Sequence, residues 1–234
     1  FESTSDASFA QTEAVDGAKI SNWYDISPNN MVHEALSQAN SAHQPVYKSS
    51  SELNGLPAVY FDANARYLWN TNYQYSQNVT MFAVAKAPLE KTMVAEGDLE
   101  WGNIFGVSSW GSCSLYTTNL ADDFTTPVKQ FHFWNASWSA VSYDRTSDNS
   151  TILAGVIDGT YTNSSNVIYK MYVQGIFAGS IDDVECNMKN DVQPTLVTGG
   201  DWADYYQGYI GELILFKRVL TDEERKSVEK YLSQ

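Results

Sequence analysis

Three carboxylates alternate in the stretch AEGDLEW at residues 95–101: Glu96, Asp98 and Glu100. If this stretch is a β-strand, all three side chains point to the same face. Glu96 and Glu100 could then approach the separation of about 5–5.5 Å that a retaining pair of catalytic carboxylates needs. Gly97 followed by Asp98 is, however, typical of a turn. We therefore expect a solvated acidic loop, with hydrolysis of glycosidic bonds as the alternative.

The composition is that of an acidic chain with a large apolar fraction. The 234 residues include 28 Asp and Glu against 14 Lys and Arg, a formal net charge of −14, and 43% are hydrophobic. This charge opposes binding to nucleic acid or to an anionic membrane surface, and no apolar run approaches the ~20 residues that span a bilayer. We expect one domain over residues 1–234, part of a longer chain, with no nucleic acid partner and no membrane insertion.

Short apolar or alternating runs recur along the chain, separated by residues that favour turns. Aromatic and β-branched side chains favour strands, whereas Gly, Asn, Asp and Ser favour the turns between them. The pattern predicts an all-β antiparallel sandwich. The expected strands lie within residues 56–62, 79–87, 103–110, 129–137, 150–158, 166–175, 194–200 and 208–218.

The run VTMFAVAKA at residues 79–87 is apolar on both faces. Phe82 and Val84 share one face of the expected strand, and the other face carries Val79, Met81, Ala83 and Ala85. A strand covered on both faces is typical of an inner position in a sheet.

One segment predicts a helix, LTDEERKSVEKYL at residues 220–232. Thr221 can cap its start, and Glu224 stands three residues later, which makes a capping box. Val228, Tyr231 and Leu232 provide an apolar stripe. We expect the charges of this helix to form a solvated face rather than a binding site.

Two blocks at opposite ends of the chain resemble one family. The first, residues 16–68, contains a Trp-x-Asp-x-Ser stretch that starts at Trp23, a Gln-Pro-x-Tyr stretch at 44–47, and LNGLPAVYFD at 53–62. The second, residues 196–232, contains a Gly-x-Ile-x-Glu strand at 208–212 and then the short Leu-Thr-x-x-Glu helix. Both blocks resemble the laminin-G-like, concanavalin-A-like jelly-roll domains of bacterial secreted and surface proteins.

The resemblance implies a two-sheet antiparallel jelly-roll β-sandwich closed by a short C-terminal helix. It also implies an extracellular or cell-surface location and a binding role, because this branch of the family is mainly a binding fold. The chain departs from the pattern at Pro28, where relatives usually carry glycine. Proline fixes φ and removes a donor, so no ligand role for that turn is carried over.

The acidic stretch also resembles a motif of concanavalin-A-like endoglucanases of the laminarinase and lichenase type. That likeness would make Glu96 the nucleophile and Glu100 the acid/base, with Asp98 tuning their protonation. Those enzymes carry a bulky apolar residue where this chain has Gly97. We therefore expect no catalytic residues and keep Glu96, Asp98 and Glu100 as the alternative.

A lectin-like module needs aromatic faces that stack on sugar rings and polar side chains that bind hydroxyl groups. The loop GGDWADYYQGY, between two expected strands, supplies both kinds of residue, and so does FHFWNASW. For both sets the alternative is that the aromatic rings belong to the core. The expected ligand-binding residues are Asp201, Trp202, Asp204, Tyr205, Tyr206, Trp134 and Asn135.

Calcium is the expected ion, because the fold often hosts it and hard oxygen ligands are abundant. The alternative for each acidic pair is a solvated turn. Cys113 and Cys186 could form a disulfide in an oxidising compartment or remain reduced thiols, and the sequence leaves both open. The candidate calcium ligands are Asp122, Asp123, Asp182 and Asp183, with the loop of Asp201 and Asp204 as a further candidate.

Together these observations predict a non-catalytic glycan-binding or adhesion module of a secreted or cell-surface protein, binding through its rim loops. Its expected partner is a glycan or another surface ligand. One alternative is an endo-acting glycoside hydrolase. The other is a structural or protein-binding tip domain of an adhesin or fibre, which could be oligomeric.

Overall fold

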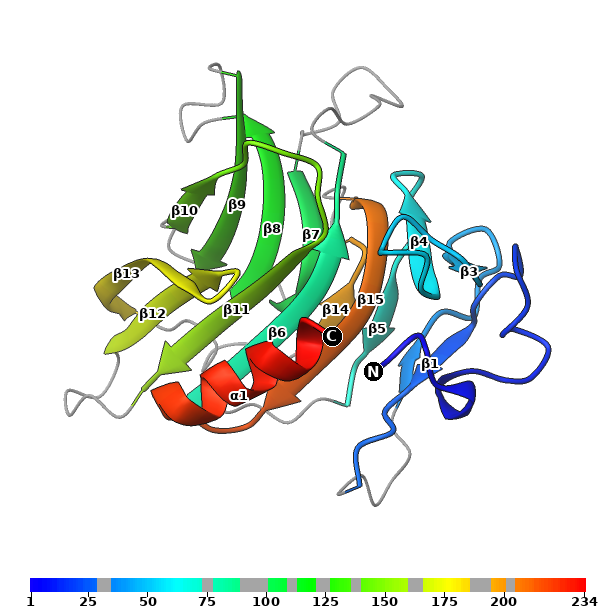
Figure 1. Ribbon diagram of the computed structural model, residues 1–234, viewed down its shortest axis with the longest axis horizontal. Helices are drawn as coiled ribbons and strands as arrows, with labels where there is room; N and C mark the ends of the chain where they lie inside the picture. The colour runs from blue at the N-terminus through cyan, green and yellow to red at the C-terminus, as the bar shows by residue number, and fades with distance from the viewer. Residues whose placement is uncertain are drawn as a thin grey trace.

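The computed structural model is a sandwich of two antiparallel sheets with one α-helix on the outside (Figure 1). It describes residues 1–28, 35–72, 78–88, 101–108, 113–120, 127–135, 140–159, 166–185, 195–200 and 205–234. The predicted fold class, a two-sheet jelly-roll β-sandwich with a C-terminal helix, is confirmed.

One sheet has eight strands in the order β1-β2-β5-β14-β7-β8-β9-β10. Neighbouring strands are antiparallel throughout. In this order the strands are β1 (Asn22–Tyr24), β2 (Ala35–Ser37), β5 (Leu68–Asn70), β14 (Thr195–Thr198), β7 (Trp101–Ser108), β8 (Cys113–Leu120), β9 (Pro127–Asn135) and β10 (Ala140–Asp144).

The other sheet has seven strands in the order β13-β12-β11-β6-β15-β4-β3, again all antiparallel. The chain also forms a short 3-10 helix, η1 (Asp6–Ser8), and the helix α1 (Asp222–Leu232). In sheet order the strands are β13 (Ile176–Glu185), β12 (Asn166–Val173), β11 (Thr151–Asp158), β6 (Asn78–Lys86), β15 (Gln207–Phe216), β4 (Ala58–Asp62) and β3 (Val46–Lys48).

Strand β6 shows how the layers are held together. Met81 and Ala83 are fully buried in the core between the sheets. Phe82 points the other way and packs in a separate cluster with Leu220 and Val228, at the start and in the middle of the helical segment. The helix thus covers the outer face of the seven-stranded sheet (Figure 1). The prediction of an inner strand with two covered faces is confirmed, because β6 lies between β11 and β15.

All eight strands expected from the sequence are present, with ends that differ by a few residues. Seven further strands in the described part of the chain lie outside these eight runs. Four of these have three residues each, too few to show a repeat of two. The further strands are β1, β2, β3, β5, β8, β10 and β13.

The segment before β1 is anchored by aromatic rings. Trp23 is fully buried, and its ring stacks on Phe9 with centroids 5.9 Å apart. Phe9 in turn meets Tyr47 of β3 edge to face at 5.3 Å. These contacts tie the first residues of the chain to strands of both sheets.

Gly208 marks a close backbone approach between β15 and β6. A Cβ at this position would lie 2.2 Å from the carbonyl oxygen of Lys86, and its φ is +140°. Only glycine fits both the space and the dihedral angle. The tight approach lets β15 pair with β6 and β4 at once.

Helix α1 begins with the predicted capping box. Thr221 Oγ1 accepts from the amide of Glu224 at 3.3 Å, and the Glu224 carboxylate accepts from the amide of Thr221 at 2.9 Å. The side chain of Arg218 donates to both oxygens of Glu224 at 2.8 Å, and these bonds lower the pKa of Glu224 to about 2. Within the described residues, no helix is long and apolar enough to cross a membrane.

The prediction that the charges of α1 form a solvated face is wrong for two of them. Arg225 and Glu229 are buried, and their side chains pair at 2.5 Å between Arg225 Nη1 and Glu229 Oε1. They lie on the face of α1 that packs on the sheet, where the Arg225 guanidinium lies over the ring of Tyr172 in β12. Tyr231, expected in the apolar stripe, is about half exposed, while Val228 and Leu232 pack on the sheet.

Candidate functional site

Most residues predicted from the sequence to carry chemistry lie outside the described part of the chain. This applies to the catalytic alternative, to most of the expected binding loop, to one candidate calcium pair and to one cysteine. Their roles stay predictions. The residues are Glu96, Asp98, Glu100, Asp122, Asp123, Asp201, Trp202, Asp204 and Cys186.

Two residues of the expected binding loop are described. Tyr206 is fully buried, where its ring meets Phe61 edge to face at 6.0 Å and its hydroxyl donates to the carbonyl of Tyr209 at 3.3 Å. Burial raises the pKa of Tyr206. An enclosed ring cannot stack on a sugar, so the prediction for Tyr206 is wrong and the core alternative holds for it. Tyr205 is partly buried against Gly200 and stays a predicted ligand-binding residue.

Four other candidates lie in strands. Trp134 and Asn135 end β9, where the backbone of Trp134 pairs with Ala140 of β10. Asp182 is exposed in β13 and Asp183 follows it. Cys113 begins β8. The described residues contain no group of three or more His, Cys, Asp and Glu side chains that could hold a metal ion, so calcium stays a prediction.

A row of polar side chains crosses the eight-stranded sheet on its outer face, turned away from the other sheet. In β9, Phe131 and Phe133 belong to the core, so the residue between them points outward. Cross-strand partners share a face, and the register carries the row over four strands. We call Asn103 (β7), Tyr116 (β8), His132 (β9) and Ser142 (β10) the polar row.

Hydrogen bonds fix the outer half of the polar row. The amide nitrogen of Gln130 donates to Asp144 Oδ1 at 2.7 Å, so the amide oxygen faces His132 Nε2 at 3.1 Å. That nitrogen must therefore donate, which leaves Nδ1 to accept from the hydroxyl of Ser142 at 3.3 Å. The polar row is an ordered network anchored at the edge strand β10.

The centre of the polar row is closed. Asn103 and His132 are fully buried, and Tyr116 is nearly so. Asn103 donates to the hydroxyl of Tyr116 at 3.3 Å, while its Oδ1 is a buried acceptor without a partner. A ligand would have to displace covering atoms to reach these groups. The polar row therefore stabilises the sheet rather than forming an accessible binding surface.

An exposed aromatic ring lies on the same face at β5. Trp69 is 45% exposed and pairs with Val197 of β14. Tyr67 meets it edge to face at 5.4 Å, and His43 stacks on Tyr67 at 5.6 Å. This surface therefore carries a small cluster of aromatic groups.

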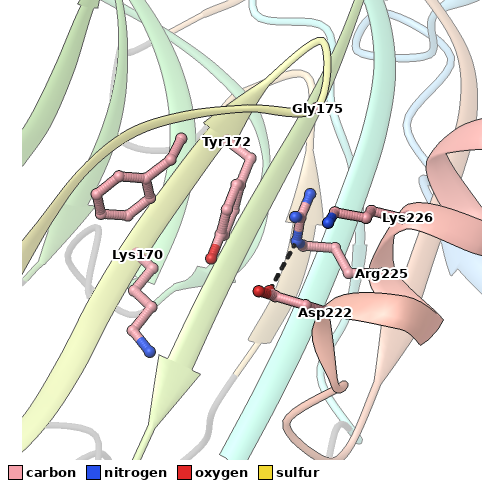
Figure 2. A pocket seen from close by; sticks show the side chains of 7 residues that line it. Lys170, Tyr172, Gly175, Asp222, Arg225 and Lys226 are labelled. Carbon is pink, nitrogen blue, oxygen red and sulfur yellow. Dashed lines mark ion pairs between the residues drawn. The ribbon is translucent and has the colours of Figure 1, made fainter.

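An open pocket lies on the opposite side of the sandwich, between the start of α1 and the β12–β13 hairpin (Figure 2). It has a volume of about 390 Å³, within the range of small-ligand sites. Its lining combines two aromatic rings, three cationic side chains, one carboxylate and a glycine. These residues are Tyr172, Phe177, Lys170, Arg225, Lys226, Asp222 and Gly175.

Three of the lining side chains contact one another in a row, with the two aromatic rings tilted by 57° to each other. The guanidinium carbon of Arg225 lies 3.7 Å from the centroid of the Tyr172 ring. The Tyr172 ring lies 5.4 Å from that of Phe177, which pairs with it across the hairpin. Phe177 is the outermost member, and 54% of its surface is exposed. An aromatic face therefore stands open to solvent beside charged groups.

Electrostatic contacts hold Arg225 in this position. Its Nη1 donates to Glu229 at 2.5 Å, and its Nε lies 3.6 Å from Asp222 Oδ1, the ion pair drawn in Figure 2. Burial raises the pKa of the Tyr172 hydroxyl, so this group stays a neutral donor at physiological pH. The wall of the pocket is thus preorganised before any ligand arrives.

Comparison with known proteins identifies a similar fold but does not identify a family. No protein-family model matches the chain, and no curated protein matches it. Domain 4 of AbnA, a GH43 extracellular arabinanase from Geobacillus stearothermophilus, solved in complex with arabinotriose, has a TM-score of 0.53 at 14% identity over 79% of this chain and 81% of that chain. The likeness supports the β-sandwich fold.

Binding domains of botulinum neurotoxins are also similar. That of neurotoxin DC, solved with rat synaptotagmin II, has a TM-score of 0.51 at 12% identity, over 89% of this chain and 51% of that chain. The serotype D binding domain has a TM-score of 0.50 at 11% identity, over 86% and 50%. This chain thus spans about half of each neurotoxin binding domain, and identities this low establish the fold alone.

Sequence reasoning missed the pocket, although part of its signal is present. In NVIYKMYV, Lys170 and Tyr172 alternate with the core residues Tyr169 and Met171, which places them on the outer face. That alternation could have suggested an outward pair of a cation and an aromatic ring. It could not have shown that Arg225 of a distant helix would stack on it.

Proposed function

We propose that the chain is a non-catalytic glycan-binding module and that the pocket between α1 and the β12–β13 hairpin binds the glycan. One observation carries the proposal: the half-exposed ring of Phe177 forms a wall of a pocket whose other walls carry hydrogen-bonding charges. The parent protein would be secreted or displayed on a cell surface, where glycans are exposed.

The lining groups match the chemistry of a sugar. A pyranose ring has an apolar face that can stack on Phe177, and hydroxyl groups at its edge that both donate and accept hydrogen bonds. The ammonium groups of Lys170 and Lys226 can donate to those hydroxyls, and the carboxylate of Asp222 can accept from them. A few convergent polar groups beside an aromatic surface are typical of specific small-ligand sites.

The same lining supports binding rather than hydrolysis. Glycoside hydrolysis uses two carboxyl groups that flank the scissile bond. Asp222 is the one carboxylate among the described residues that line the pocket, and its neighbour is the cation Arg225 at 3.6 Å rather than a second acid. The solved domain of the arabinanase in complex with arabinotriose supports a sugar-binding role for a sandwich of this kind.

The test is a binding titration with a panel of neutral and acidic oligosaccharides, for the parent and for two variants. Phe177→Ala removes the exposed ring of the pocket, and Trp69→Ala removes a similarly exposed ring on the opposite side of the sandwich. Truncation of a binding aromatic costs about 2 kcal/mol or more, which corresponds to a loss of at least about thirtyfold in affinity.

We expect Phe177→Ala to lose binding and Trp69→Ala to keep it, with unchanged thermal unfolding for both. The reverse result would place the site on the outer face of the eight-stranded sheet and refute the pocket. Absence of binding to every oligosaccharide would refute the glycan-binding function. Release of reducing sugar by the parent chain would refute its non-catalytic character.

A further inference from the structure

We propose that the sugar bound in this pocket is a hexuronate, a sugar residue that carries one carboxylate. The inference rests on the proposed function, because it names the ligand class of the same site. It follows from a difference in ion pairing among the three cationic side chains that line the pocket.

Arg225 is neutralised within the protein. Its side chain is 4% exposed, and it forms ion pairs with the buried Glu229 at 2.5 Å and with Asp222 at 3.6 Å. It also lies against the Tyr172 ring. Arg225 therefore stabilises the wall of the pocket, and the carboxylates of Glu229 and Asp222 already compensate its charge.

Lys170 and Lys226 are not neutralised. Neither side chain takes part in any of the ion pairs found among the described residues. Lys170 comes from β12 and Lys226 from α1, so the two reach the pocket from different elements (Figure 2). In a chain with a net charge of −14, two ammonium groups that form no ion pair within the described part of the chain concentrate positive charge beside one pocket.

The pocket suits a carboxylate better than a phosphate. Phosphates are commonly bound by free amide groups at a helix N-terminus, but the first turn of α1 is occupied by its own capping box of Thr221 and Glu224. Asp222 and Glu223 add negative charge there.

The aromatic wall of the pocket indicates a ligand that contains a ring. The open face of Phe177 needs an apolar surface to cover it, which a small free anion lacks. A hexuronate offers that surface, one carboxylate for the lysines and hydroxyls for Asp222. Each exposed lining group then has a partner of matching chemistry.

The experiment compares hexuronate trimers of galacturonate, glucuronate, mannuronate and guluronate with their methyl esters. The esters keep the rings and remove the charges. We expect at least one acid trimer to bind about tenfold tighter than its ester, with a preference that weakens at high salt. The double variant Lys170→Gln with Lys226→Gln should abolish the preference for the acid trimer over its ester. Lys230→Gln removes one positive charge from the exposed last turn of α1 and should not change the preference.

The outcomes separate this inference from the function on which it rests. If a trimer and its ester bind equally and Phe177→Ala abolishes both, the pocket binds sugars but the hexuronate assignment is refuted. If the preference persists in the double lysine variant, the carboxylate is bound elsewhere and the assignment is again refuted. If neither acids, esters nor neutral oligosaccharides bind, both proposals fail together.

Discussion

The buried pair of Arg225 and Glu229 allows a prediction about stability that also tests the wall of the pocket. Both side chains are at least nine-tenths buried, and their atoms lie 2.5 Å apart. Removing one partner of a buried pair costs about 3–5 kcal/mol, because the other charge is left uncompensated. For Glu229→Leu we expect the low end, about 3 kcal/mol, since Arg225 keeps Asp222 and the Tyr172 ring as neighbours.

The double variant Arg225→Met with Glu229→Leu should cost much less, about 1 kcal/mol, because no buried charge remains. The assay is urea unfolding of the parent, both single variants and the double variant, with the m-value monitored for changes in the denatured state. For a chain of this size the single variant should lower Tm by about 6–12 °C. A comparison variant, Glu223→Gln in the exposed first turn, should change stability by less than about 0.5 kcal/mol.

The reasoning would be refuted by a cost for Glu229→Leu below about 1 kcal/mol, which would mean that the pair is solvated. A double variant that costs the sum of the two single variants would also refute it, since it would show that the two charges do not interact.

Three further predictions concern the framework. Burial, with the charge of Glu2 as a second cause, raises the pKa of Glu212 to about 7. The stability that Glu212 contributes is therefore fully present below its pKa in the unfolded chain, about 4.5, and is lost as the pH rises through 7. The expected loss is about 1–2 kcal/mol after allowance for partial exposure. Glu212→Gln should flatten stability between pH 5 and 8 relative to the parent in urea titrations, and parallel pH curves would contradict this. Gly208→Ala should cost about 2 kcal/mol or more in the same titrations, because its Cβ would meet the carbonyl of Lys86 at 2.2 Å; a neutral effect would show that β15 can shift. Thr221→Ala should cost about 1 kcal/mol through loss of the helix cap, and Thr221→Ser, which keeps the hydroxyl, should restore most of it.

The layers of the fold could be predicted because their signal is local. In β6, Met81 and Ala83 alternate with Phe82, so the sequence of one strand indicates both the face in the core and the face that the helix covers. The capping box of Thr221 and Glu224 likewise lies within four residues. Strands of three residues, such as β1 and β5, carry no repeat and depend on neighbours that are distant in sequence.

The candidate site could not be predicted, because its residues meet only through tertiary packing. Lys170 and Phe177 belong to one hairpin, whereas Arg225 comes from a helix some fifty residues later in the sequence. Helical spacing places Arg225, unlike Lys226, on the face of Val228 and Leu232, but it does not show that this face buries Arg225 on a tyrosine ring. Tyr205 and Tyr206 show the same limit, since neighbouring identical residues differ only in which one the core encloses.

The order in which strands join the sheets has a consequence for how the chain acquires its structure. Strand β15 lies between β4 and β6, and β14 lies between β5 and β7, so a late strand fills an inner position in each sheet. During synthesis, neither sheet can be completed until residues 195–216 have left the ribosome. Pairings between such distant segments are slow to form, typically on a timescale of milliseconds to seconds. The nascent chain must therefore keep the unpaired edges of β4, β5, β6 and β7 from self-association, and chaperone dependence during synthesis is the expected cost of this topology.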